Sequence, residues 1–325
     1  MKKTIFMAEK IYLIDDFDLG LPQRTGSYFL DEEELTIIET CTSRSIPYIL
    51  EGLKELGKSP EDVKYIIVTH IHLDHAGGAG LLLSYCPNAK VIVHPKGVRH
   101  LANPEKLIAG AKAVYGERFD ELFHPVLPVP EEKILIKDHD DTLQIGQDCT
   151  LSFFDTPGHA NHHMSIYDEK RKLIFTGDTA GVSYPQLKKY GAELFLPSTS
   201  PNQFDPIKML DSIGLYEGME VESIYFGHFG ATSNPEEVYR QIRYWLPIFL
   251  NETQKVFSSM ADPKKGALQL KNSLYTLVSE SLRDILIPKN DDFFTILNLD
   301  LSVSSMGLID YFTKLEIKKQ KETAL

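Results

Sequence analysis

The chain concentrates metal-ligating side chains in one short segment, His70-Ile71-His72-Leu73-Asp74-His75. Burying three imidazoles and a carboxylate is costly unless they bind something, and their nitrogen and oxygen atoms suit zinc and similar metals. Because His70 and His72 are two positions apart, an extended backbone directs both to one side. Asp74 and His75 come where the chain is expected to turn into a helix near Gly77, so they can point at a neighbouring position. The segment therefore predicts two adjacent metal ions.

Three more polar residues each come just after a predicted buried strand and beside a glycine: His159, Asp178 and His228. In sheet proteins, ligands gather at the edge formed by the carboxyl ends of the strands. Together with the first segment they make five histidines and two aspartates. That set suffices for two ions, with three imidazoles on one, two imidazoles and an aspartate on the other, and one shared aspartate.

The first two thirds of the chain alternate short apolar runs with stretches of helical periodicity, which indicates an α/β fold. Strands are predicted at Ile11–Ile14, Ser27–Leu30, Leu35–Glu39, Tyr65–Val68, Val91–Val93, Ile134–Ile136, Leu151–Phe154, Met164–Tyr167, Leu173–Phe175 and Ser223–Phe226. Helices are predicted at Ser45–Leu56, Gly77–Cys86, Leu107–Val114 and Ile207–Leu215.

From about residue 234 the pattern is helical almost to the end. Asn234-Pro235-Glu236-Glu237 is typical of a helix start, with a capping Asn, Pro in the first turn and carboxylates at the positive end of the helix. Pro247 predicts a kink in this helix, and further helices are expected at Leu268–Leu282 and Leu308–Leu315. We therefore expect a catalytic domain over residues 1–233 and a helical extension, 234–325, that packs on it.

The composition is that of an ordinary globular protein, with 42% apolar and 25% charged residues in 325. The net charge of −12 argues against nucleic acid as a partner. Uninterrupted apolar stretches such as Ala76–Leu83 are far shorter than the roughly 20 residues that cross a bilayer, so no membrane partner is expected. The apolar run Thr4–Ala8 is too short for a secretory leader, and the three widely spaced cysteines are typical of reduced thiols. A cytoplasmic location is expected.

The motifs, taken in order, resemble those of the metallo-β-lactamase superfamily. The resemblance rests on Thr69–Gly78, Thr156-Pro157-Gly158-His159, Gly177-Asp178 and Gly227-His228, over roughly residues 10–230. The stretches at 156–163 and 176–181 are similar to a prokaryotic branch near the glyoxalase II-like hydrolases. Where the family often has Asp-Thr-Gly, this chain has Glu39-Thr40-Cys41. Basic residues like those that hold glutathione in glyoxalase II are not found.

The resemblance implies an αββα sandwich, here with a C-terminal helical appendage, and two divalent metal ions at one edge of the sheets. Carried over residue by residue, it assigns the first ion to His70, His72 and His159. It assigns the second ion to Asp74, His75 and His228, with Asp178 bridging the two. Zinc is the expected metal, with iron, manganese and nickel as alternatives, since imidazole and carboxylate accept all of them.

The predicted activity is hydrolysis of a small-molecule ester, lactone or thioester by a hydroxide shared between the metals. Asp74 is a candidate to pass a proton to the leaving group. The alternatives are an iron-dependent oxygenase or other redox enzyme, a phosphodiesterase or nuclease, and a purely structural metal site. Structural zinc sites are usually rich in cysteine, which argues against the last of these.

Several further residues are open candidates for a supporting role. Tyr184 and Tyr190 lie on the loop after Asp178, His94 directly follows the strand predicted at Val91–Val93, and His163 comes soon after His159. The remaining histidines that are not ligand candidates are assigned to hydrogen-bonding or surface roles: His100, His124, His139 and His162. A homo-oligomer formed through the C-terminal helices is a further possibility.

Overall fold

The computed structural model describes residues 4–323, so the outermost residues of both predicted domains lie outside it. The chain divides into two compact units. The first contains the chain up to Thr156, His162–Gly177 and Met219–Pro235. The second contains Pro157–Asn161, Asp178–Gly218 and the chain from Glu236. The helical extension thus shares a unit with Asp178–Gly218, and the predicted domain boundary at residue 233 stays a prediction.

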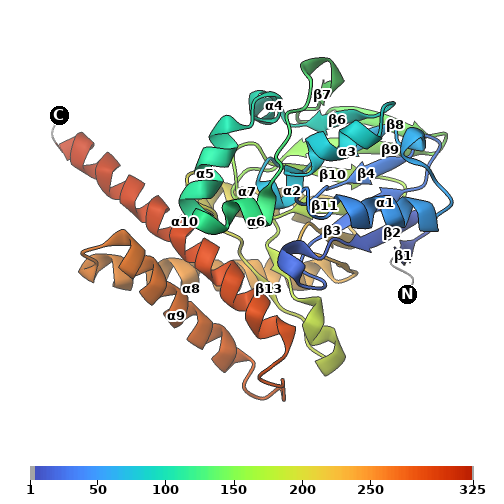
Figure 1. Ribbon diagram of the computed structural model, residues 1–325. Helices are drawn as coiled ribbons and strands as arrows, with labels where there is room; N and C mark the ends of the chain where they lie inside the picture. The colour runs from blue at the N-terminus through green and yellow to red at the C-terminus, as the bar shows by residue number, and fades with distance from the viewer. Residues whose placement is uncertain (1–3, 324–325) are drawn as a thin grey trace. The chain divides into compact units, whose positions relative to one another are not determined.

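The first unit is built on two mixed β-sheets (Figure 1). The seven-stranded sheet has its strands in chain order: β1 (Thr4–Ala8), β2 (Ile11–Asp15), β3 (Gly26–Leu30), β4 (Thr36–Ile38), β5 (Tyr65–Ile67), β6 (Lys90–Val93) and β7 (Ile134–Ile136). The six-stranded sheet has the order β15 (Ala231–Thr232), β14 (Ser223–Phe226), β11 (Leu173–Gly177), β10 (Met164–Asp168), β9 (Cys149–Asp155) and β8 (Thr142–Gly146).

Alternation along the strands of the seven-stranded sheet separates two apolar cores. Side chains on successive positions of a strand point to opposite faces. Ile66 packs in the core that includes α1 (Ile46–Glu55), whereas its neighbour Ile67 packs in the core between the two sheets. The second core combines side chains of both sheets, such as Ile92 and Phe175. Both faces are buried, so a one-residue slip of register would move each side chain into the opposite core.

Short helices connect the strands of the first unit: α2 (Leu73–Ala76), α3 (Ala79–Tyr85), α4 (Val98–Ala102), α5 (Glu105–Tyr115) and α6 (Phe119–Phe123). The helix predicted at Gly77–Cys86 corresponds to α3, and the short helix α2 precedes it, separated by Gly77 and Gly78. The predicted helix at Ser45–Leu56 is confirmed as α1, whose residues Ile46, Ile49 and Leu53 are buried at helical spacing.

Strand direction brings the ends of several strands to one edge. β4, β5, β6 and β7 run parallel, so their carboxyl ends lie together. In the other sheet, β11 and β14 are parallel, and β9 has the same direction because β10 is antiparallel to both β9 and β11. The Met164 N–H donates to the Thr69 carbonyl oxygen at 2.8 Å, which joins the two sheets at this edge.

The second unit is mostly helical. It contains the hairpin of β12 (Val182–Ser183) and β13 (Phe195–Leu196) and the helices α7 (Pro206–Glu217), α8 (Pro235–Ser259), α9 (Pro263–Ser281) and α10 (Asp292–Thr323). Helix α8 starts with the predicted proline and acidic turn, and it continues through Pro247. Helices α9 and α10 run side by side (Figure 1).

Helix α10 is much longer than the predicted Leu308–Leu315 segment. Within residues 4–323 it is the helix that is long and apolar enough to cross a membrane by length and composition alone. Its 18-residue window has a mean hydropathy of 1.2, and 56% of that window is buried inside the protein. Core helices of globular proteins meet the same criterion. The expectation that the protein has no membrane partner stays a prediction.

A buried charge network lies at the turn between β10 and β11. The Arg171 guanidinium donates to Asp168 at 2.5 Å and also to Glu32, which lies at the turn after β3. The Lys10 ammonium adds a 2.8 Å contact to Glu32. The Asp168 and Glu32 carboxylates are 0% and 5% exposed, while Arg171 is 14% and Lys10 49% exposed, so the network links the two sheets through two buried carboxylates and two cations that water partly reaches.

Candidate metal centre

Residues His70 to His75 follow β5 at the edge where the parallel strands end. His72 has extended backbone angles and comes directly before α2, so the segment is extended up to His72 and helical after it. The rings of His70 and His72 lie with their centroids 4.6 Å apart, and those of His70 and His75 lie 4.2 Å apart. Three imidazoles of this segment are therefore gathered in one place.

Asp74, His75 and His228 form a complete donor group inside the first unit. One ligand atom of each lies within 4.8 Å of the others. The Asp74 Oδ2 atom is 3.8 Å from His228 Nε2 and 4.0 Å from His75 Nε2. Because β14 is parallel to β11 in the second sheet, its carboxyl end carries His228 to this edge. An aspartate and two imidazoles at this spacing are a set that can hold one divalent ion.

Gly227 allows His228 and His75 to approach. A Cβ atom at Gly227 would lie 2.6 Å from His75 Cε1, so a larger residue would displace that ring. This close packing explains why a glycine precedes His228, which the sequence alone does not explain.

His159 and Asp178 belong to the second unit, where they also lie together. His159 Nε2 is 3.7 Å from Asp178 Oδ2. The His159 Nδ1–H donates to the Ser198 carbonyl oxygen at 3.0 Å, which leaves the Nε2 lone pair available as a metal ligand. The Ser198 hydroxyl donates to Asp178 Oδ2 at 3.0 Å. One serine thus orients both side chains, and no signal in the sequence singles it out.

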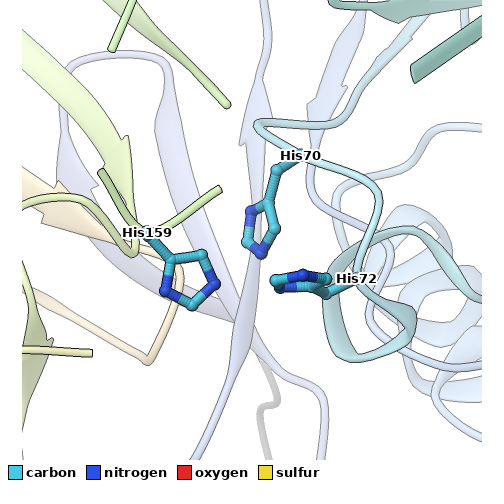
Figure 2. Close-up of side chains that lie close together, drawn as sticks. All are labelled: His70, His72 and His159. Atoms are coloured by element: carbon cyan, nitrogen blue, oxygen red, sulfur yellow. The ribbon is translucent and has the colours of Figure 1, made fainter. Parts of the chain in front are cut away.

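The covalent chain ties these two residues to the first unit. His159 stands in a five-residue segment, Pro157–Asn161, that both leaves and re-enters the first unit, and Asp178 directly follows Gly177. Each of the residues drawn in Figure 2, His70, His72 and His159, offers one imidazole nitrogen as a metal ligand.

Glu39 supports the first-unit cluster from the end of β4. Its Oε1 atom accepts the Thr69 N–H at 3.2 Å, and its Oε2 atom lies 3.5 Å from His75 Nδ1. Thr40 adds its hydroxyl and its N–H, which both donate to the His75 carbonyl oxygen. A carboxylate on Nδ1 directs Nε2 toward a metal. The glutamate that stands where the family often has aspartate therefore faces the site.

We expect Glu39→Gln to weaken zinc binding by roughly 10–100-fold, the usual cost of losing an outer partner of a metal ligand. Glu39 faces two N–H groups, but glutamine has only one acceptor oxygen. The glutamine NH₂ group would therefore face the N–H of either Thr69 or His75, and that hydrogen bond would be lost. Chelator competition measures the zinc affinity. The exposed neighbour Glu33 gives the matched control, Glu33→Gln, and equal affinities in the two variants would contradict the role of Glu39.

Asp16, at the end of β2, is a buried carboxyl group whose pKa burial raises well above its ordinary value. The charges of Asp15 and Glu39 raise it further, while the Ser27 hydroxyl, 2.9 Å from Oδ2, opposes the shift. The folded protein therefore keeps a proton on Asp16 at a pH where the unfolded chain has lost it. This group lowers stability progressively as the pH rises above about 4.

Asp16→Asn is accordingly expected to raise the free energy of unfolding at pH 8, because asparagine is neutral at every pH. The gain should shrink as the pH falls toward about 4, where the unfolded aspartate also holds its proton. Denaturant unfolding at several pH values measures it, with the exposed Asp148→Asn as control. If the free energies of unfolding of the variant and the native protein differ more in acid than at pH 8, the raised pKa of Asp16 is contradicted.

The other candidates named from the sequence lie as follows. His94 is buried, with Nε2 3.2 Å from Asp155 Oδ1. His163 is buried against His70, at a centroid distance of 5.1 Å. The Tyr190 hydroxyl donates to Asp291 at 2.6 Å, and Tyr184 packs on Phe293. In the described contacts the two tyrosines therefore serve packing within the second unit.

The cysteines are buried thiols without disulfide bonds. Burial raises the pKa of Cys41 to about 12 and that of Cys149 to about 11. A thiol that stays protonated at neutral pH is a poor nucleophile.

The donor set fits divalent metal ions. Within the first unit, Asp74, His75 and His228 are buried or half-buried, and a carboxylate with two imidazoles suits zinc, iron or manganese rather than calcium or magnesium. Without a metal, these desolvated polar groups would be unfavourable. The chain therefore has a His/Asp cluster able to bind metal.

Known proteins that are similar in sequence include members of the metallo-β-lactamase superfamily. The N-acyl homoserine lactonase AttM of Rhizobium radiobacter is 27% identical over 182 residues, which cover 55% of this chain and 63% of the lactonase. This chain thus spans a little under two thirds of that relative. The metallo-beta-lactamase fold-containing protein ST1585 of Sulfurisphaera tokodaii is 27% identical over 216 residues, which cover 65% of this chain and 75% of the relative.

Solved structures show the same fold. The archaeal metallo-beta-lactamase superfamily protein ST1585 from Sulfolobus tokodaii matches with a TM-score of 0.65 and 21% identity, over 92% of this chain and 97% of that one. The metallo-beta-lactamase family protein TTHA1429 from Thermus thermophilus matches with a TM-score of 0.63 and 18% identity, over 95% of each chain. At these identities the likeness concerns the fold alone.

The family model of the metallo-beta-lactamase superfamily matches residues 22–228, from the loop before β3 to His228. The predicted fold class, a metallo-β-lactamase sandwich followed by C-terminal helices, is confirmed, and α8–α10 lie beyond the matched segment. The chain belongs to the metallo-β-lactamase superfamily, whose members are generally hydrolytic metalloenzymes.

Proposed function

We propose that the protein is a dinuclear metal-dependent hydrolase that cleaves an ester, lactone or thioester bond of a small molecule. The observation that carries the proposal is the complete group of Asp74, His75 and His228 within 4.8 Å. An enzyme with a single metal ion has no need of this second set beside His70 and His72. The similarity to AttM, an N-acyl homoserine lactonase, favours lactones among the three substrate classes.

The proposed ligand assignment is the one that the family resemblance implies. His70, His72 and His159 would hold one ion, Asp74, His75 and His228 the other, and Asp178 would bridge them. Two divalent ions held there, with zinc as the expected metal, would polarise the substrate carbonyl and supply a nucleophile at neutral pH.

The residues of the chain set the geometry and move the proton. Ser198 and Glu39 fix Asp178, His159 and His75 through the contacts described above. The Asp74 side chain is 21% exposed, more than those of His75 and His228, so it faces the side from which substrate arrives. We assign to its carboxylate oxygen the transfer of a proton to the departing alcohol or thiol.

The test is a kinetic screen on protein of measured metal content. Purified protein is expected to hold about two metal ions per chain and to hydrolyse at least one member of an ester, lactone and thioester panel. Oxygen consumption under air with a single iron per chain would instead favour the redox alternative. Salt-dependent binding and cleavage of single-stranded RNA would favour the nuclease alternative.

We propose a small-molecule substrate without nucleic-acid or membrane partners, a cytoplasmic location, and self-association through the C-terminal helices. The division into residues 1–233 and 234–325 is likewise a proposal, which limited proteolysis would test.

A further inference from the structure

His162 lies directly against two of the proposed ligands. It is 4% exposed, and its ring is nearly parallel to that of His70, at 10° and a centroid distance of 6.2 Å. It meets His72 edge to face, at 88° and 5.3 Å. The His162 ring therefore lies beside both ligand rings.

His162 also holds the backbone between these ligands. Its Nδ1 atom accepts the N–H of Ile71 at 3.5 Å. Ile71 is 1% exposed, so this N–H has no access to bulk water and depends on a partner within the protein. Since Nδ1 accepts, the neutral ring carries its proton on Nε2.

The residues that follow His162 form hydrogen bonds to Thr156, the residue directly before the loop that carries His159. The His163 carbonyl oxygen accepts the Thr156 N–H at 3.1 Å, and His163 Nδ1 lies 3.0 Å from the Thr156 hydroxyl. These bonds close the base of the segment Pro157–Asn161. The Met164 N–H in turn donates to the carbonyl oxygen of Thr69, the residue before His70. Residues 162–164 therefore contact the start of the His70–His75 segment and the start of the His159 loop.

We infer that His162 is a positioning residue that fixes the His70–His72 segment for metal binding through its Nδ1 acceptor. This role rests on the proposed dinuclear site and goes beyond the ligand set assigned there. The segment must present two nitrogens to one ion, and a mobile Ile71 peptide would let them separate. Outer partners of this kind typically change metal affinity 10–100-fold when removed.

The test compares His162→Asn with His162→Leu. The two replacements have nearly the same shape, and the Asn Oδ1 atom takes the place of the histidine Nδ1 acceptor while Leu offers none. Zinc affinity by chelator competition should fall about 10–100-fold for Leu and stay within about threefold of the native protein for Asn. The visible absorption bands of the cobalt-loaded protein should shift for Leu and keep their native shape for Asn.

His139→Leu is the matched control, because exposed His139 also accepts a backbone N–H on Nδ1, that of Asp155 at 3.2 Å. It should bind zinc with native affinity. Equal affinities and spectra for the Asn and Leu variants, whether both native or both weakened, would overturn the inference. If the Leu variant does not fold by circular dichroism, His162→Phe takes its place. A native protein that binds no metal would instead overturn the proposed function.

Discussion

Alanine in place of His72 or of Asp178 abolishes hydrolysis and leaves the fold intact. Each replacement removes a proposed ligand, and Asp178 is proposed to serve both ions. Metal-assisted polarisation contributes several kcal/mol to the stabilisation of a transition state, and each 1.36 kcal/mol is a factor of ten in rate. We therefore expect kcat/KM to fall by about 10³ or more, measured on the best substrate of the panel.

The fold is expected to survive because neither side chain is part of the apolar cores. Circular dichroism of metal-free native and variant proteins checks this. His139→Ala provides the control, since that side chain is 48% exposed and stands outside the cluster. Native turnover by a variant whose metal content has been measured would remove His72 or Asp178 from the proposed site.

Arg171→Met destabilises the protein by about 3–5 kcal/mol, the usual cost of removing one partner of a buried ion pair. The replacement leaves the Asp168 carboxylate in a place that water does not reach, and Glu32 keeps only Lys10. Burial alone would raise the pKa of Glu32, but the hydrogen bonds and charges of Lys10 and Arg171 together outweigh burial and lower this pKa below its ordinary value. The stabilisation from Glu32 is therefore present above about pH 4.3 and is lost as the pH falls further.

Denaturant unfolding at pH 7 and in acid measures both effects. The adjacent Lys170→Met is the control, because Lys170 and its partner Asp148 are 57% and 75% exposed and surface pairs contribute at most about 1 kcal/mol. The difference in free energy of unfolding between the native protein and Arg171→Met should become smaller in acid. A similar, small loss in both variants would mean that the network does not stabilise the sheets.

The donor residues could be predicted because they obey a local rule. Polar residues beside glycine, placed just after apolar strands, are unusual for a packed core, and the parallel strand order then gathers them at one edge. Glu39 also comes at the end of an apolar strand, the one predicted at Leu35–Glu39, but it has no glycine beside it. It was visible in the sequence as a departure from the family pattern, but its contact with His75 depends on tertiary packing.

Ser198 and His162 could not be recognised in this way. Ser198 acts through a hydroxyl and a carbonyl group in a loop, and no local pattern distinguishes it from other serines. His162 differs from other histidines only through the ring contacts that the folded sheet creates. The roles of Ser198 and His162 depend on contacts between residues that are distant in the sequence, and a local sequence pattern does not show such contacts.

Parts of the fold escaped prediction for related reasons. The strand β1 is an edge strand with exposed Ile5 and Phe6, so it lacks the buried alternation that marks a strand. Helix α10 mixes serine and aspartate with its apolar residues, including buried Ser304, Ser305 and Asp300, which hides its periodicity. Residue propensity alone cannot show that these polar groups lie inside the protein.

The most direct measurement is a crystal structure of the metal-loaded protein with anomalous diffraction at the metal absorption edge. Two anomalous peaks are expected at the sheet edge, one beside His70, His72 and His159 and one beside Asp74, His75 and His228, with Asp178 between them. Two-metal sites hold their ions about 3.5–4 Å apart. The absence of any peak at that edge, or a single ion that leaves Asp178 and His228 without contact, would contradict the dinuclear site.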